Sequence, residues 1–498
     1  MVPLSIISVN LLSDNLLLLA SLLVFAAILV TKIGAKIGTP TLLVFLVIGM
    51  LAGEDGLGLK FEDYELAESI GHFAMTIILF AGGLETSLDE TRPVMKPGVM
   101  LSTLGVFLTA AFTGLFIYFV LGSYIGVLGT SLLSCFLLAA VMSSTDSASV
   151  FSVLRGKKMH LRQNLGPMLE LESGSNDPMA YVLTIILVQM LSTRQVGPIG
   201  PLPMIWKVTW TLLLQLAVGF AVGIGAGFAS KVLLEKVKLP GRQLYSILIL
   251  SIGFLTNGLA SVLYGNGLLA LYVCAIVIGN KARIPHKKDV LTFFNGMTWL
   301  MQLLMFLVLG LLARPSEFGP IAIPALLIGL FMMIIARPLS VFISLLPFRS
   351  ITPRAKVFVS WVGLKGAGPI LFALCPVVAG LDGSSDIFNI VFFITLISLL
   401  LQGMTLTPVA DWLKLSYEEE AKVETFGMDI PEEMGMLRDH TVTEDDLKLG
   451  ETLRDMNLPH GIRVMMIRRE DKFLVPHGSM KLEPGDRLII IMGESDDD

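Results

Sequence analysis

Three acidic residues lie inside long apolar stretches of the sequence, where a charged side chain is costly to bury. Asp146 ends the segment SSTD at 143–146, while Glu172 and Asp177 both belong to the segment ELESGSNDP at 170–178. A charge at the centre of a membrane-spanning helix costs about 2.5–3.5 kcal/mol on insertion scales. Because no histidine or cysteine that could ligate a metal is nearby in the sequence, the three carboxylates indicate a cation pathway.

The spacing around Asp177 predicts a set of oxygen ligands. In a helix, Glu172 lies beside Asn176 and Ser173 beside Asp177, on neighbouring stripes of one face. Pro178 has no amide hydrogen, so the carbonyl four residues before it loses its helical partner. A carboxylate, a hydroxyl and a free carbonyl are hard ligands that suit an alkali cation.

The candidate residues differ in the role we expect. Arg337 stands in the apolar run IIARP at 334–338 and needs a buried partner, for which Glu172 is the candidate. We therefore favour a structural role for Glu172 and a transport role for Asp177. Glu170 and His72 are weaker candidates that fit span edges or packing.

A buried carboxyl group shared by a proton and a metal ion is sufficient for exchange. Asp177 can hold either one, but not both. Its neighbour Asn176 is neutral rather than a second acid. This predicts that one proton exchanges for one monovalent cation without net charge movement.

The composition places these residues in a membrane. Over half of the 498 residues are apolar (54%) and 15% are charged, against about 25% in soluble proteins. Apolar runs separated by short loops continue to about Leu415, and we expect the first run, from Asn15 to Thr31, to be a retained span. Thirteen spans are expected, centred near Val24, Val47, Ile77, Phe107, Leu138, Leu183, Val218, Leu250, Val273, Leu304, Leu330, Phe372 and Ile397.

Loop charges predict the orientation of the spans. Alternate loops, at 32–36, 155–162, 231–242, 281–288 and 349–356, are rich in Lys and Arg, whereas the loops between them are poor in both or acidic. Basic loops stay in the cytosol. We expect a multi-pass protein of the cytoplasmic (inner) membrane with its N-terminus outside and its C-terminus in the cytosol. The glycines at 219, 223 and 227 predict close helix packing.

Two spans contain segments that are poor continuous helix. With the seventh span set aside as a linker, SSTDS at 143–147 and GLKGAGP at 363–369 fall in the fifth span of each set of six. Interrupted segments at matching positions of two halves indicate an inverted-repeat transporter. Asp146 could offset the exposed helix ends at the first break and Lys365 those at the second. The plain alternative is two unrelated kinks.

Three motifs resemble the NhaP-type cation/proton antiporters, above all the bacterial potassium/proton branch that carries a cytosolic regulatory domain. They are STD at 144–146, ESGSNDP at 172–178 and WVGLKGA at 361–367. The resemblance implies an all-α polytopic membrane protein of 13 transmembrane helices, with inverted repeats and two crossed unwound helices. It also implies a homodimer that works by alternating access, through elevator-like movement of spans four to six and eleven to thirteen.

The resemblance also assigns roles to individual residues. Asp177 resembles the cation- and proton-binding acid, and Asp146, Ser173 and the backbone around Thr145 complete the site. Asp177, Asp146 and Ser173 would thus ligate the transported cation. Asn176 resembles the neutral partner of electroneutral members, and Glu172 and Arg337 resemble a buried ion pair. Lys365 stands where relatives usually have arginine, which keeps the charge but not the planar fork.

The polar tail predicts a second, small domain. After a transmembrane domain at 1–415 and a linker at 416–436, residues 437–498 carry a helical pattern at Leu447–Met456 and strand patterns at Ile462–Arg468, Phe473–Val475 and Arg487–Met492. The pattern resembles the C-terminal half of the potassium-conductance regulator domain (RCK-C or TrkA-C), a cytosolic α/β domain. That implies sensing of an ion or a ligand, a nucleotide among the candidates. A plain dimerisation module is the alternative.

Other functional classes fit less well. A regulator-gated potassium channel would need a filter resembling TVGYG, which the sequence lacks. A proton-coupled solute carrier could use the same broken helices. We expect neither an enzyme nor a cofactor, because no nucleophile–base pair, metal constellation or dinucleotide motif is present, and no nucleic acid as a partner. The prediction is an electroneutral antiporter for pH homeostasis, and carboxylate–hydroxyl ligands serve potassium and sodium alike.

Overall fold

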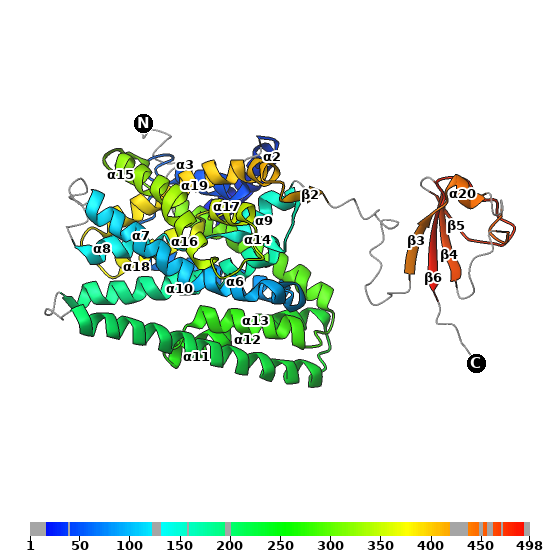
Figure 1. Ribbon diagram of the computed structural model, residues 1–498, viewed down its shortest axis with the longest axis horizontal. Coiled ribbons are helices and arrows are strands. Elements are labelled where there is room, and N and C mark those ends of the chain that lie inside the picture. The colour runs from blue at the N-terminus through cyan, green and yellow to red at the C-terminus, as the bar shows by residue number, and fades with distance from the viewer. Residues whose placement is uncertain are drawn as a thin grey trace, which may run out of the picture. The chain divides into compact units, whose positions relative to one another are not determined.

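The computed structural model describes residues 16–37, 40–121, 131–156, 159–194, 201–418, 437–447, 452–455, 462–469 and 472–492. The chain divides into two compact units, Met1–Tyr417 and Glu418–Asp498. The first is a bundle of helices and the second is built on a small sheet (Figure 1).

The membrane unit consists of apolar helices joined by short loops. In its first half these are α2 (Leu16–Ile37), α3 (Thr41–Ala52), α4 (Tyr64–Glu85), a run of linked turns from α5 (Leu88–Thr91) through η1 (Arg92–Val94), α6 (Met95–Met100), η2 (Leu101–Gly105) and α7 (Val106–Phe116) to η3 (Ile117–Leu121), then α8 (Leu132–Val141), α9 (Ser147–Gly156) and α10 (Leu165–Arg194).

The second half continues the same pattern. Its helices are α11 (Pro201–Lys236), α12 (Arg242–Val262), α13 (Gly267–Lys281), α14 (Lys287–Leu311), the linked run η5 (Pro315–Glu317), α15 (Phe318–Phe331), η6 (Met332–Ala336) and α16 (Arg337–Ser344), then α17 (Pro353–Trp361), α18 (Ala367–Val378) and α19 (Ser384–Trp412). Two short strands, β1 (Met159–Leu161) and β2 (Ser416–Glu418), pair with each other.

The structure supports a polytopic membrane protein. Among the described residues, seven helical segments are long and apolar enough to cross a membrane, and five more apolar helices are shorter. Each of the thirteen expected centres falls within a helix. Length and composition alone do not make every one of them a crossing, so the count of thirteen stays a prediction.

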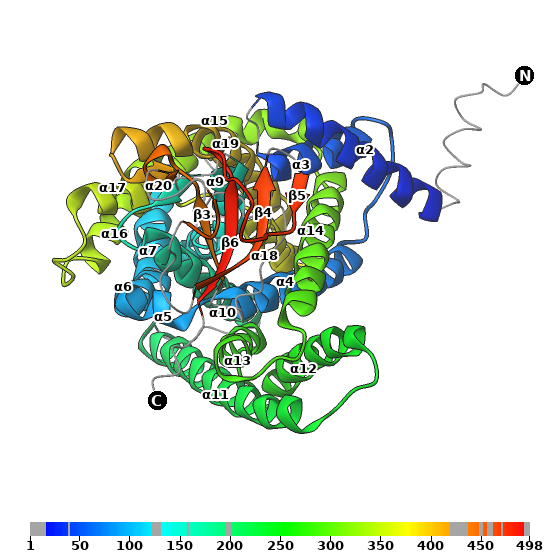
Figure 2. The same cartoon turned by 90° about the vertical axis from the view of Figure 1, so that its right-hand side faces the viewer.

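Glycines let several helices approach closely. A Cβ added to Gly219, Gly223 or Gly227 of α11 would come within 2.7 Å of backbone or side-chain atoms at Asn266, Ala270 or Val277. The close packing expected from this spacing is therefore confirmed, and its partner is α13. Helices α11, α12 and α13 lie together in both ribbon views (Figures 1 and 2).

Helices α3 and α14 also pack closely, and both border the candidate functional site described below. A Cβ on Gly49 of α3 would lie 2.5 Å from the carbonyl oxygen of Leu307, and one on Gly310 of α14 would lie 2.4 Å from that of Leu46. The two backbones therefore touch, and α3 and α14 pack together as one layer of the membrane unit.

The tail unit is a four-stranded antiparallel sheet in the order β3-β6-β4-β5. Its strands are β3 (Leu437–Thr441), β4 (Ile462–Arg469), β5 (Lys472–Leu474) and β6 (Arg487–Met492), with a short helix α20 (Glu444–Leu447). The three strands expected from the sequence are present within one residue of their expected bounds, and β3 was not expected.

The helix expected over Leu447–Met456 is wrong in its described part. Residues 453–455 form a turn, and Thr452 bridges Lys481 instead of continuing a helix. Thr443 caps the short helix α20, because the Thr443 hydroxyl accepts the amide of Asp446. Pairing with the sheet thus prevails over the local helical pattern.

A buried ion pair stabilises the turn before β6. Arg469 donates from Nε to Asp486 Oδ1 at 2.9 Å and from Nη2 to Oδ2 at 2.7 Å, and Asp486 is 1% exposed. Burial alone would raise the pKa of Asp486, but the bonds from Arg469 and from the Glu483 amide hold the pKa below its ordinary value.

We expect Asp486→Asn to destabilise the tail unit by roughly 1.5–3 kcal/mol, because it removes a charged hydrogen-bond acceptor from a buried site. Since the folded pKa is lowered, the contribution of Asp486 is complete at neutral pH. It should be lost only as the pH falls below about 4, towards the folded pKa. Hydrogen exchange of residues 462–492 in the full chain, measured from pH 5 to 8, should show a deficit that does not change with pH. Glu483→Gln, at an exposed side chain, should cost under about 1 kcal/mol; an equal cost would contradict the assignment.

Candidate functional site

Two helices of the membrane unit are interrupted where the sequence predicts breaks. Helix α8 ends at Val141 and α9 begins at Ser147, and helix α17 ends at Trp361 and α18 begins at Ala367. The residues between them, 142–146 and 362–366, are not helical.

The two non-helical segments lie against each other. The amide of Asp146 donates to the carbonyl oxygen of Leu364 at 2.8 Å, and Lys365 Nζ donates to the carbonyl oxygen of Ser144 at 2.8 Å. A Cβ on Gly366 would lie 1.9 Å from Asp146 Oδ2, so only glycine fits there without rearrangement. Segments more than 200 residues apart thus satisfy one another's backbone groups.

Both charged residues of the breaks act on helix ends, but not as a matching pair. Asp146 caps α9, because Asp146 Oδ1 accepts the Ser149 amide at 3.1 Å and Asp146 Oδ2 accepts the Ser149 hydroxyl at 2.5 Å. Asp146 therefore offsets the first break, as expected. The Lys365 ammonium, which is 2% exposed, binds a carbonyl of the first break rather than one of its own segment. Its partner, the Ser144 carbonyl, belongs to the non-helical segment that follows α8.

Helix α10 carries a row of polar side chains to the first break. Ser144 donates its hydroxyl to Asp177 Oδ1. Ser173 Oγ donates to the Thr145 carbonyl oxygen at 3.0 Å and accepts the Ser147 amide at 3.1 Å. The helix is continuous through Pro178. The stripe expected from helical spacing therefore faces residues 144–147.

Asn176 is held beside the same segment. Its Nδ2 donates to Thr145 Oγ1 at 2.5 Å. Its Oδ1 is buried and has no hydrogen-bond partner among the residues that the structure describes. A buried acceptor that is unpaired costs about 1–3 kcal/mol. The amide is thus held in place by one end only, with an oxygen left available.

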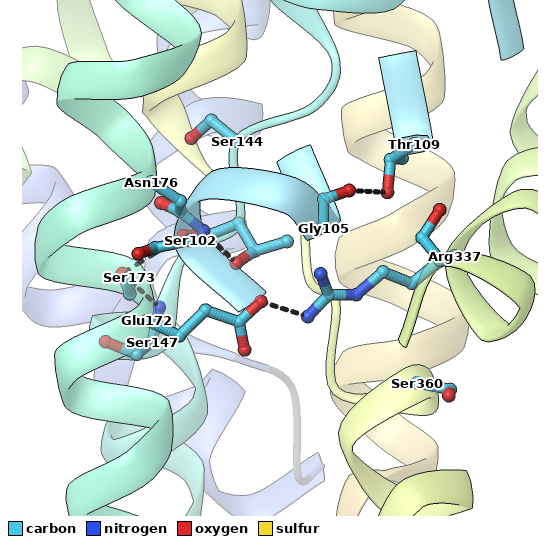
Figure 3. Close-up of polar contacts among 12 residues, drawn as sticks. Ser102, Gly105, Thr109, Ser144, Ser147, Glu172, Ser173, Asn176, Arg337 and Ser360 are labelled. Atoms are coloured by element: carbon cyan, nitrogen blue, oxygen red, sulfur yellow. Dashed lines mark hydrogen bonds and ion pairs between the residues drawn. The ribbon is translucent and has the colours of Figure 1, made fainter. Parts of the chain in front are cut away.

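Glu172 lies on the same helix but pairs with a residue outside the first break. Arg337 donates from Nη2 to Glu172 Oε1, and the two side chains are 3% and 1% exposed. Figure 3 shows the guanidinium reaching across to the carboxylate. The ion pair expected from the apolar run around Arg337 is present. A Cβ on Gly363 would lie 3.1 Å from Arg337 Nε, so the pair also borders the second break.

A small cavity of about 50 Å³ lies next to the two non-helical segments. Ser144, Asp146, Asp177, Ala367 and Gly368 line it on the side of the breaks. Asp177 receives one hydrogen bond from the described part of the chain, at Oδ1, which leaves Oδ2 to the cavity. Ser173 and Thr145 contact each other behind this wall and do not line the cavity.

The opposite wall was not expected from the sequence. Leu42 of α3, Met75, Ile78 and Leu79 of α4, and Gln302, Met305 and Phe306 of α14 form it. Gln302, which is 8% exposed, supplies the polar group of this wall. In the sequence, Gln302 stands out as a lone amide in the apolar run of α14. The sequence alone does not show which residues on other helices Gln302 faces.

Family models match both units of the chain. The model described as "Sodium/hydrogen exchanger, transmembrane" matches residues 20–412, and the model described as "TrkA-C domain" matches residues 437–496.

Several curated proteins are similar over nearly the whole chain. The K+/H+ antiporter NhaP2 of Shewanella baltica (strain OS223) is 37% identical over 481 residues, which are 96% of this chain and 81% of that protein. The K+/H+ antiporter NhaP of Alkalimonas amylolytica is 36% identical over 484 residues, with the same two shares. Among solved structures, the sodium proton antiporter MjNhaP1 from Methanocaldococcus jannaschii at pH 8 aligns with a TM-score of 0.66 at 20% identity. That alignment covers 82% of this chain and 99% of the archaeal one, so the fold is shared.

Proposed function

Since this chain belongs to the sodium/hydrogen exchanger family and is a cation/proton antiporter, we propose that it exchanges a potassium or sodium ion for a proton at Asp177. The observation that carries the proposal is the single cavity shared by Asp177 and Asp146 at two interrupted helices. Ser144 binds one oxygen of Asp177, whereas Ser149 binds both oxygens of Asp146. The free oxygen of Asp177 is therefore the group that can change its ligand.

The exchange follows from competition for that oxygen. A proton on Asp177 removes the negative charge that a cation needs, and a bound cation in turn displaces the proton. Asp146 adds a second carboxylate to the cavity, and the Gln302 amide on the opposite wall offers a further oxygen ligand. We assign Ser173, Thr145 and Asn176 the task of holding residues 144–147 in place, and Lys365 the task of neutralising the broken end of α8.

The finer architecture belongs to the same proposal. Thirteen spans in two inverted sets, with the segments at 142–146 and 362–366 crossing at mid-membrane, would place opposite helix ends around one cavity. The hydrogen bond between Asp146 and Leu364 supports such a crossing. We further propose an inner-membrane homodimer with its N-terminus outside, which works by alternating access, and a cytosolic tail unit that regulates transport in response to an ion or a nucleotide.

Cation-dependent proton exchange in everted vesicles tests the function. Potassium and sodium, added separately from pH 6 to 9, should dissipate a preformed pH gradient, whereas organic solutes should not. If neither cation dissipated the pH gradient, the proposed function would be refuted. Currents far above the turnover of a transporter in a planar bilayer would favour a channel.

The stoichiometry gives a separate prediction. Because Asp177 has the neutral Asn176 as its neighbour, one proton should leave for each monovalent cation that enters, and no net charge should move. The rate of exchange in proteoliposomes should therefore be the same at every voltage across the membrane. The voltage is set without a potassium gradient and without valinomycin. A rate that changes with voltage would contradict one-for-one exchange.

A further inference from the structure

A second group of polar side chains lies in the membrane unit outside the carboxylate site. Glu68 and His72 belong to α4, Tyr181 to α10 and Cys375 to α18. The rings of His72 and Tyr181 meet edge-on with their centroids 5.0 Å apart, and Tyr181 also contacts Phe372 at 5.6 Å. Glu68 lies close enough to Cys375 for the two side chains to interact electrostatically.

This group, the Glu68 cluster, lies directly beyond the cavity on all three helices. The cavity-lining residues of these helices are Met75, Asp177 and Gly368. His72 precedes Met75 by about one turn on α4, which follows the acidic loop. Tyr181 follows Asp177 by about one turn on α10, which comes after a basic loop, and Phe372 follows Gly368 by about one turn on α18, which continues beyond α17 and its basic loop. On each of the three helices, the cluster therefore lies one turn from the cavity, towards the membrane face that the loop charges predict to be the outer one.

Packing at this level is close. A Cβ on Gly71 would lie 2.3 Å from Leu371 Cδ1, so α4 and α18 touch beside the cluster. The ring contacts of Tyr181 with His72 and Phe372 lie in the same layer, and Cys375 is 4% exposed. In this conformation the cluster therefore separates the cavity from that face.

The cluster contains polar groups, which apolar packing alone does not explain. The rings of His72 and Tyr181 contact each other. Within the described part of the chain, the imidazole of His72 and the hydroxyl of Tyr181 have no hydrogen bond. Both side chains are only half-buried, as is Glu68. Polar groups that are left unpaired inside a helix bundle are unfavourable unless water or an ion reaches them.

We propose that Glu68, His72 and Tyr181 line the outer end of the ion route to Asp177, and that the contact between His72 and Tyr181 closes this route in the conformation seen here. Glu68 then attracts a hydrated monovalent cation or a proton at the outer face, one turn before the barrier. The proposal rests on the proposed function, because it extends the path from the same cavity.

Accessibility of a thiol placed at Met75, which lines the cavity behind the contact between His72 and Tyr181, tests the barrier without requiring transport. In a full-length protein carrying Cys135→Ala, Cys274→Ala, Cys375→Ala and Met75→Cys, a membrane-impermeant cationic thiol reagent is added to right-side-out or to everted vesicles. Tyr181→Ala and His72→Ala should each speed labelling of the introduced thiol from the outer face by roughly tenfold or more, because the closed state loses its ring contact. Phe73→Ala is the matched control, since Phe73 stacks on Phe254 instead; it should leave the labelling rate unchanged.

Cation affinity tests the role of Glu68. Glu68→Gln should raise the apparent KM for the cation several-fold when the cation is offered at the outer face, and leave the KM at the inner face unchanged. Glu65→Gln, an exposed residue one turn away on α4, serves as control. Melting curves in detergent establish that each variant is folded.

Three results would overturn the inference: labelling of the thiol introduced at Met75 from the inner face only even when Tyr181 or His72 is replaced by alanine, outer-face labelling that neither replacement accelerates, or a Glu68→Gln effect that is equal on both faces. The proposed function fails differently. If wild-type vesicles show no cation-dependent proton exchange but the outer labelling pattern holds, the barrier stands and the exchange reaction does not.

Discussion

Replacing Asp177 with asparagine should reduce cation-dependent proton exchange to the level of vesicles that lack the protein. Asparagine keeps the size of the side chain and can still accept a hydrogen bond from Ser144. It loses the negative charge and the exchangeable proton. The variant should therefore fold normally and fail only in transport.

The expected size of the loss follows from the cost of an uncompensated charge. A charge at the bilayer centre costs about 2.5–3.5 kcal/mol on insertion scales. At 1.4 kcal/mol per tenfold change, this corresponds to cation binding that is weaker by about 60- to 300-fold. Asp146 remains in the cavity, but hydrogen bonds from Ser149 already hold both of its oxygens. We do not expect it to replace Asp177.

Dequenching of a pH-sensitive dye in everted vesicles measures the effect, with equal amounts of folded protein confirmed by melting curves. Asp382→Asn makes the same chemical change at an exposed loop residue and should transport normally. If Asp177→Asn retained full exchange with either potassium or sodium, the binding site would have to lie elsewhere.

Replacing Glu172 with glutamine should produce the largest loss of stability in the membrane unit. Arg337 would keep its charge at a position that is 3% exposed, and its Nε already lacks a partner among the described residues. Removing one member of a buried ion pair costs about 3–5 kcal/mol, because the other charge is left uncompensated. The damage should extend to the second break, which packs against Arg337 at Gly363.

A double-mutant cycle separates charge from shape. Arg337→Met alone should be destabilising, and Glu172→Gln combined with Arg337→Met should be more stable than either single variant, because no buried charge is left unpaired. Unfolding by SDS in mixed micelles gives the free energies. Arg349→Met, in an exposed loop, should stay within about 0.5 kcal/mol of the wild type. Additive losses in the double variant would mean that the two residues do not act as a pair.

Local chemistry made part of the site predictable from the sequence. Hydroxyls and an acid at 143–147, and three glycines at 363–369, cannot form ordinary membrane helix, and helix interruptions occur at both places. Helical spacing also predicted that Ser173, Asn176 and Asp177 lie on neighbouring stripes of one face of α10, and all three contact residues 144–145.

Contacts between distant segments could not be predicted in the same way. The sequence shows that Lys365 needs a partner, but it does not show that the partner is the carbonyl of Ser144. Gln302 and Met75 reach the cavity only because α14 and α4 pack beside the breaks. His72 fits packing when α4 is considered alone and gains another role only beside Tyr181. In the tail, sheet pairing at Thr452 prevails over a helical pattern.

The most direct measurement is proton release when the purified protein binds its cation. In weakly buffered detergent solution with a pH-sensitive dye, potassium or sodium added near the pH at which Asp177 is half protonated should release a proton in proportion to the cation bound. The release should fall away at high pH, where no proton remains to be displaced. Asp177→Asn should release none. Cation binding without proton release, or the same release from Asp177→Asn, would contradict a carboxylate that the two ions occupy in turn.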